Sequence, residues 1–90
     1  MSDIAGCLQQ LLADVVGMYH KAHGYHWNVT GAGFQQFHQF LGSLYEDVYG
    51  SVDTIAENIR KRDAFPQFTV QSLASQTKVG TKDAGTGPLA

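Results

Sequence analysis

The sequence predicts an all-α fold: an antiparallel helical hairpin that dimerises into a four-helix bundle, with a short helix and an extended C-terminal tail. Two long segments carry apolar residues at steps of three and four, and a glycine-bearing corner separates them. A chain of 90 residues cannot bury both stripes in one hairpin without a staple or a partner. We therefore expect a hairpin at residues 1–63, a connector helix region at 64–76 and a Gly- and Thr-rich tail at 77–90.

The first segment is expected to form a helix that Ser2 or Asp3 caps. Its apolar stripe follows helical spacing and consists of Ile4, Leu8, Leu11, Leu12, Val15, Tyr19, Ala22 and His26-Trp27. Gly24 lies within the stripe and weakens the helix by about 1 kcal/mol relative to alanine. The single cysteine, Cys7, excludes an intrachain disulfide and is interpreted as a small core residue.

The second segment is expected to form one continuous helix that ends with Arg60-Lys61-Arg62, before Pro66. Its stripe consists of Phe34, Phe37, His38, Leu41, Leu44, Tyr45, Val48, Val52, Ile55, Ala56 and Ile59. We interpret the basic triplet as a charge cluster at the helix end rather than a nucleic-acid patch. Gly42 and Gly50 either let another helix approach closely or are merely tolerated in the helix.

The region after Pro66 is expected to contain one or two helical turns between Thr69 and Ser75. Val70, Leu73 and Ala74 would lie on one side of that short helix. The tail that follows contains too little apolar surface to fix itself, so we expect a neighbouring chain to hold it.

Charge and composition exclude several classes of function. The net charge is −2 and no basic run is present, which argues against nucleic-acid binding. No apolar run approaches the roughly 18 residues of a membrane span, and no signal peptide is recognisable. The sequence therefore predicts a cytoplasmic protein, or one inside a viral or other macromolecular particle.

Two histidines lie at equal distances from the corner. The centre of the corner is near Ala32, with His26 six residues before it and His38 six residues after it. In a pair of antiparallel helices, equal distances place the two imidazoles opposite each other. The pair is either a metal site or two ordinary, partly buried histidines near a turn.

Two carboxylates, Asp53 and Glu57, are four residues apart and project from one helix face. Such a pair usually marks a solvated face. His38 and Asp53 are fifteen residues apart, or roughly 22 Å along a helix, which is too far to share a metal ion. They can meet only if an identical helix runs antiparallel beside the first, with a two-fold axis near Tyr45-Glu46. Two imidazoles and two carboxylates would then suit an exchangeable first-row metal such as iron.

Several motifs together resemble the Dps family of ferritin-like mini-ferritins. They are His26-Trp27-Asn28-Val29-Thr30-Gly31, Phe34, Phe37-His38, Leu44-Tyr45-Glu46-Asp47 and the run from Val52 to Arg60 with its D-x-x-A-E pattern. The resemblance covers roughly residues 5 to 75. It implies a ferritin-like fold, and oxidation of ferrous iron, usually by hydrogen peroxide, at sites between two-fold-related subunits of a homodimer or higher homo-oligomer.

The resemblance also implies roles for single residues. His26 and His38 would be metal ligands from one chain, and Asp53 and Glu57 would be ligands from the other, with Glu57 as the bridge. Trp27 would lie near the iron. Zinc is the alternative metal for this site. His23 would orient a ligand or relay protons beside the site, or it is a polar-face residue like His20. The four tyrosines are packing groups or, as the alternative, electron donors.

Two departures from the family pattern limit what the resemblance implies. Gly42 stands where the family usually has a further carboxylate, four residues after the second histidine. The third and fourth long helices and a basic N-terminal extension are absent from the sequence, so iron storage in a cage and DNA compaction are not expected. Two functions remain. The first is an iron-binding ferroxidase, and the second is a non-catalytic structural subunit of a larger assembly, for which a viral particle is one candidate.

Overall fold

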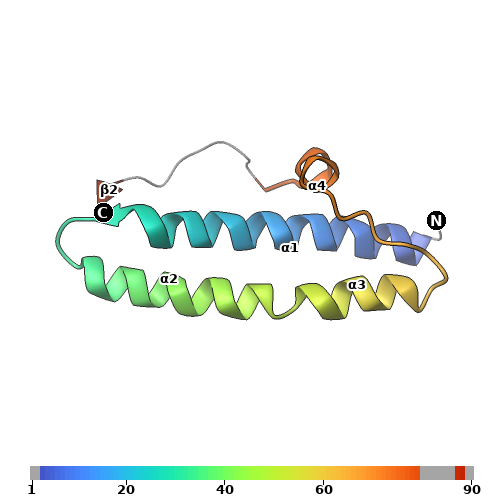
Figure 1. Ribbon diagram of the computed structural model, residues 1–90, viewed down its shortest axis with the longest axis horizontal. Coiled ribbons are helices and arrows are strands. Elements are labelled where there is room, and N and C mark those ends of the chain that lie inside the picture. Colours follow the sequence, from blue (N-terminus) through green and yellow to red (C-terminus); the bar gives the residue numbers. More distant parts are fainter. Residues whose placement is uncertain (1–2, 80–86, 89–90) are drawn as a thin grey trace.

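The computed structural model describes residues 3–79 and 87–88, and it consists of two antiparallel helical rods (Figure 1). The first rod is α1 (Asp3–Asn28), and the second is α2 (Phe34–Tyr49) followed by α3 (Val52–Arg60). The connector contains α4 (Val70–Gln76), which lies on the side of α1 that faces away from α2 and α3. The molecule extends 49 × 22 × 17 Å. The predicted all-α hairpin with a short helix is therefore confirmed, whereas the cap at Ser2 lies outside the described residues.

The second rod is not the single continuous helix that the sequence analysis predicted. It is interrupted at Gly50 and Ser51, where the Ser51 amide donates to the carbonyl of Val48 at 3.2 Å rather than to that of Asp47. The Ser51 hydroxyl donates to the same carbonyl at 2.8 Å. Glycine has a weak helix preference, and a serine hydroxyl competes for backbone carbonyls, so the pair is a natural break point. Both residues keep right-handed backbone angles, and α3 continues along the line of α2 (Figure 1).

The corner joins α1 to α2 through the two-residue strand β1 (Val29–Thr30) and two glycines. Gly31 and Gly33 have φ angles of 87° and 80°, in a backbone region that residues other than glycine rarely adopt. The Phe34 amide donates to the Gly31 carbonyl at 3.2 Å and closes the turn. The glycines therefore allow a tight reversal, which brings the end of α1 beside the start of α2.

The apolar core lies at the end of the hairpin that is far from the corner. Leu12, Ile55 and Ile59 form its centre, and Ile59 is 0% exposed. Half-buried residues from α1, α3 and the connector surround them: Leu8, Val15, Val16, Val52, Ala56, Ala64 and Leu73. The predicted stripes thus face each other, but Cys7 is exposed and the prediction that it is a core residue was wrong. Its position on α1 turns it away from α3.

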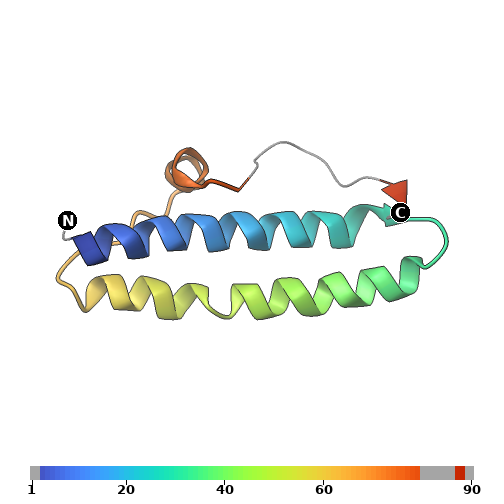
Figure 2. The same ribbon diagram turned by 180° about the vertical axis from the view of Figure 1, so that it is seen from behind.

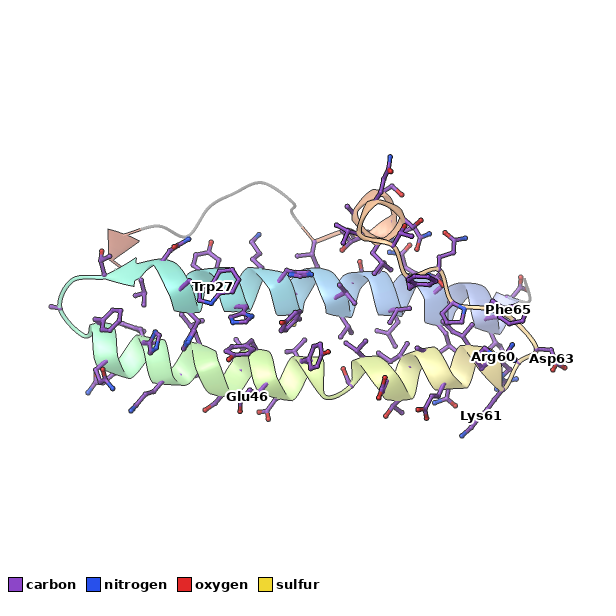
Figure 3. All side chains as sticks on the ribbon, viewed as in Figure 1. Trp27, Glu46, Arg60, Lys61, Asp63 and Phe65 are labelled. Carbon is purple, nitrogen blue, oxygen red and sulfur yellow. The ribbon has the colours of Figure 1, made fainter. Side chains whose placement is uncertain are left out.

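The basic triplet lies at this same end (Figure 3). Only Arg60 falls in the last turn of α3, because Lys61 and Arg62 belong to the turn that follows. The Arg60 guanidinium lies over the ring of Phe65, 4.1 Å from its centroid, and Asp63 adopts a left-handed backbone with φ of 58°. A residue with a left-handed backbone, as Asp63 has here, commonly follows the end of a helix.

Glutamine side chains attach the connector to α1. Gln9, only 7% exposed, donates to the carbonyl of Gln67 at 3.2 Å and to the side chain of Gln76 at 2.9 Å. Its own carbonyl oxygen accepts from the Gln67 amide at 2.9 Å. Thr69 caps α4 by accepting from the Ser72 amide at 3.0 Å.

The three apolar residues that were expected on one side of α4 are not all buried. Leu73 packs on the core, but Ala74 is exposed and Val70 is 81% exposed. The short helix is attached to α1 through hydrogen bonds from Gln9 and Gln10 to Gln76 as well as through Leu73. Its other apolar residues therefore need not face α1.

The start of the tail lies against α1. Lys78 donates its amide to Asp14 at 2.7 Å, and the Thr77 hydroxyl donates to the same carboxylate oxygen at 3.2 Å. A Cβ added to Gly17 would lie 2.7 Å from the Thr77 hydroxyl oxygen, so the glycine permits this close approach. Residues 80–86 and 89–90, where most of the expected tail falls, are outside the described residues, and the contact with a neighbouring chain stays a prediction.

Near the C-terminus, β2 (Gly87–Pro88) pairs in parallel with β1, with Val29 opposite Gly87 and Thr30 opposite Pro88. Figure 2 shows this pair from behind, beside the corner end of α1. None of the helices in the described residues combines the length and apolarity of a membrane span.

Candidate metal centre

His26 and His38 are in direct contact across the hairpin, close to the corner. Their ring centroids are 3.6 Å apart, and their planes are inclined by 20°, so the imidazoles are stacked. The expectation that equal distances from the corner would bring the two rings to the same level is confirmed.

The two histidines exchange hydrogen bonds with each other's backbone. Nδ1 of His26 lies 2.6 Å from the carbonyl oxygen of His38, and Nδ1 of His38 lies 2.8 Å from the carbonyl oxygen of His26. Because a carbonyl oxygen only accepts, each Nδ1 carries the proton and donates it. In the neutral imidazoles, each Nε2 therefore carries the lone pair that a metal ion requires. Ligating histidines in proteins usually have this arrangement, with the other ring nitrogen bonded to a carbonyl or carboxylate.

The stacked arrangement restricts how the two Nε2 atoms can bind. An imidazole lone pair lies in the plane of its own ring, and these two planes are nearly parallel. The two lone pairs therefore cannot both point at one ion without rotation of a ring. The pair as it stands suits two neighbouring ions, one for each imidazole.

An aromatic cluster surrounds the pair between α1 and α2. The ring of His23 stacks on Tyr45, with centroids 3.9 Å apart and planes inclined by 7°. Nδ1 of His23 lies 3.2 Å from the hydroxyl oxygen of Tyr19. Burial, and then the neighbouring His26 and His20, lower the pKa of His23 below its usual value.

Of the two interpretations of His23, a position beside the histidine pair fits the structure and a polar-face position does not, whereas His20 is exposed as expected. His23 points into the hairpin because it lies one turn before His26 on the same helix. Three of the four tyrosines pack near one another: the ring of Tyr19 lies 4.8 Å from that of Tyr49 and 6.0 Å from that of Tyr45.

Trp27 lies at the edge of this cluster and is 65% exposed (Figure 3). Its ring centroid is 4.2 Å from that of His23, and this contact connects it to the cluster. Trp27 is the only tryptophan in the chain, so its fluorescence reports on this end of the hairpin alone.

The predicted carboxylate ligands lie on a different helix. Asp53 and Glu57 are exposed on α3, and Asp53 lines a shallow pocket at the helix break together with Tyr49, Gly50 and Val52. The described residues contain no group of three or more His, Cys, Asp or Glu side chains that could hold a metal ion. The structure thus brings the two histidines together and leaves the two carboxylates apart from them. Sequence reasoning missed the break that precedes Asp53, for which Gly50 followed by Ser51 was the available signal.

Comparison with known proteins relates the chain to one family. Residues 6–87 match the ferritin-like domain family. The DNA protection during starvation protein of Brevibacillus brevis is 33% identical over 87 residues, which are 97% of this chain and 57% of that protein. The protein of the same name from Halobacterium salinarum is 33% identical over 72 residues, which are 80% of this chain and 40% of that protein.

A solved structure gives the same relation. The Dps protein of Vibrio cholerae O1, described as a member of a broad superfamily of ferritin-like diiron-carboxylate proteins, is 26% identical with a TM-score of 0.87. The match covers 92% of this chain and 52% of that chain. The ferritin-like fold expected from the sequence is therefore confirmed. The chain spans about half the length of the relatives that it matches.

Proposed function

We propose that this chain, which belongs to the Dps family of ferritin-like proteins, binds ferrous iron at sites shared by two copies and oxidises it. The observation that supports this proposal best is the histidine pair, in which both Nδ1 atoms are bonded and both Nε2 atoms remain for a metal ion. Iron is the substrate here, and a copy of the same chain is the partner.

The ligand set would come from two copies of the hairpin. His26 and His38 of one copy would each bind one ferrous ion, because their stacked rings suit two ions. Asp53 and Glu57 of the second copy would supply the negative charge, with Glu57 bridging the ions. Imidazole and carboxylate together suit iron and also zinc, so zinc is the expected competitor.

The reaction would be a two-electron oxidation. Each of two ferrous ions loses one electron, and one molecule of hydrogen peroxide accepts both electrons and two protons to give two molecules of water. The carboxylates would favour the ferric products because charge attraction grows with the charge of the ion. Dioxygen is the alternative oxidant.

The proposal is tested by titrating the full chain anaerobically with ferrous iron and then adding peroxide. Binding is followed by Trp27 fluorescence, and oxidation is followed by ferric absorbance. We expect saturable quenching and rapid oxidation in the unaltered protein, with loss of both in His26→Ala and in His38→Ala. His20→Ala is the matched control, because His20 is an exposed histidine on the same helix as His26. Equal quenching in all three variants would contradict the proposal.

A non-catalytic structural subunit is the second candidate function. The absence of a ligating side chain at Gly42, and the exposed apolar residues Ile4, Leu11, Met18, Phe37 and Phe40, favour it. These residues would be covered by other chains in an assembly. No iron response, together with a large particle in light scattering, would support this candidate over the first.

A further inference from the structure

We propose that Gly42 is the positioning residue of the histidine pair, because its missing side chain leaves the carbonyl of His38 open to His26. The role follows from the contacts of the hairpin itself. The inference rests on the proposed function in one respect only. Under that function, Nε2 of His26, which keeps its lone pair when Nδ1 donates to the carbonyl of His38, is an iron ligand.

The first step of the argument is the geometry of α2. Side chains on an α-helix lean toward its N-terminus, so a residue covers the turn that precedes it. Residue 42 stands four positions after residue 38, and its side chain would therefore lean over the carbonyl of His38. That carbonyl lies inside α2, where carbonyls accept from the amide four residues later. A second donor must therefore reach it from the side of the helix.

The second step is the distance between Gly42 and His26. A Cβ added to Gly42 would lie 3.2 Å from Cε1 of His26 and 3.4 Å from its Nδ1. The Nδ1 atom is the donor of the 2.6 Å hydrogen bond to the carbonyl of His38. A Cβ at position 42 would therefore press on the His26 ring and force it to shift by a few tenths of an ångström away from this bond, and a branched side chain would press on it further.

The third step is the contrast with the other half of the exchange. The carbonyl of His26 lies in the last turn of α1, where carbonyls have no helical amide to accept from. It is open to His38 without help from a glycine. Only one of the two hydrogen bonds therefore depends on Gly42, and this asymmetry gives the test its specificity.

Gly24 on α1 provides a matched comparison. A Cβ added to Gly24 would meet nothing within 4 Å, so glycine is not required there by contact. Both glycines lie inside helices, and replacing either one removes the same helix penalty of about 1 kcal/mol. A difference between the two sites then reports on His26 and not on helix preference.

The experiment measures imidazole tautomers in the full, metal-free chain by ¹⁵N NMR with labelled histidine. In the unaltered protein we expect both His26 and His38 to carry the proton on Nδ1. In Gly42→Ala, and more strongly in Gly42→Val, His26 should lose this tautomer preference while His38 keeps it. Gly24→Ala and Gly24→Val should leave both rings unchanged. A general loss of structure would instead affect both histidines.

Cobalt(II) absorption provides a second readout. Changes to the partners of ligating histidines typically weaken metal binding about 10- to 100-fold, and we expect a loss of this size in Gly42→Val but not in Gly24→Val. An unchanged His26 tautomer in Gly42→Val would overturn the inference. So would an Nε2–H tautomer of His26 in the unaltered protein, a measurement that remains decisive if the valine variant does not fold. Correct tautomers without ferrous binding would instead reject the proposed function and leave the role of Gly42 intact.

Discussion

Asp14 shows how one carboxylate on α1 can hold a distant part of the chain. One of its oxygens accepts from the amide of Lys78, from the hydroxyl of Thr77 and from the side chain of Gln10. The amide of Lys78 is the main cause that lowers the pKa of Asp14 below its ordinary value of 3.8. Hydrogen bonds from neutral donors stabilise the ionised carboxylate, so the contact depends on its charge.

We predict that acid releases the start of the tail from α1. A lowered pKa in the folded state means that the stabilisation is present above pH 3.8 and is lost as the pH falls through the lower folded value. Hydrogen exchange of the Lys78 amide should show protection that disappears in this range. Asp14→Ala should remove the protection at neutral pH, whereas Asp47→Ala, at an exposed carboxylate on α2, should not. Full protection in Asp14→Ala would contradict this account.

The histidine pair shows which features of single residues can be predicted from sequence. Equal distances from Ala32 predicted that His26 and His38 would lie at the same level, and they do. Their tautomers could not be predicted, because they depend on which backbone carbonyls are open. The position of His23 allowed either a place beside the site or a polar face, and only its stacking on Tyr45 decides between them.

At the scale of elements, α4 is attached mainly through polar contacts. The Gln9 side chain satisfies both the amide and the carbonyl of Gln67 and also reaches Gln76, which bonds Gln67 in turn at 2.6 Å. Gln10 adds a bond to the backbone carbonyl of Gln76 at 2.9 Å. Few apolar contacts accompany this network, because Leu73 is the residue of α4 that reaches the core.

We predict that Gln9→Leu detaches α4 from α1. Leucine has a similar size but leaves the partners of Gln9 without their hydrogen bonds, which costs about 1–3 kcal/mol. Urea unfolding should show a loss of this size, and amide exchange should show that α4 loses protection first. Gln39→Leu is the control, because Gln39 is exposed on α2. Equal stability of the two variants would show that the glutamine contacts do not hold the connector.

The elements themselves were largely predictable, and their errors have local causes. The steps of three and four residues predicted both rods, and the glycines predicted the corner between them. The break at Gly50 and Ser51 was missed because the apolar stripe continues across it from Val48 to Val52. Periodicity reports which face is buried, but it does not report a change of hydrogen bonding in the backbone.

At the scale of the whole molecule, the hairpin leaves a large part of its apolar surface exposed. Ile4, Leu11 and Met18 recur at seven-residue steps and so lie along one side of α1, and all three are exposed. Phe65 and Phe68 of the connector are exposed as well. A row of exposed apolar side chains along one side of a helix is typical of a contact with another chain.

The most direct test of the shared site is a mixing experiment with two inactive variants. One variant carries His26→Ala and His38→Ala, and the other carries Asp53→Ala and Glu57→Ala. Each alone should fail to oxidise ferrous iron. In a mixed dimer, the intact histidines of one copy would face the intact carboxylates of the other.

Co-refolding equal amounts of the two variants should restore about a quarter of the unaltered protein's ferrous-binding sites, since random pairing makes half of the dimers mixed and each mixed dimer has one intact site. Ferrous titration followed by Trp27 fluorescence would measure the recovered fraction. Recovery near this value is the result that the account predicts. If mass spectrometry shows that mixed dimers form but no binding returns, then the two pairs of ligands do not meet between copies.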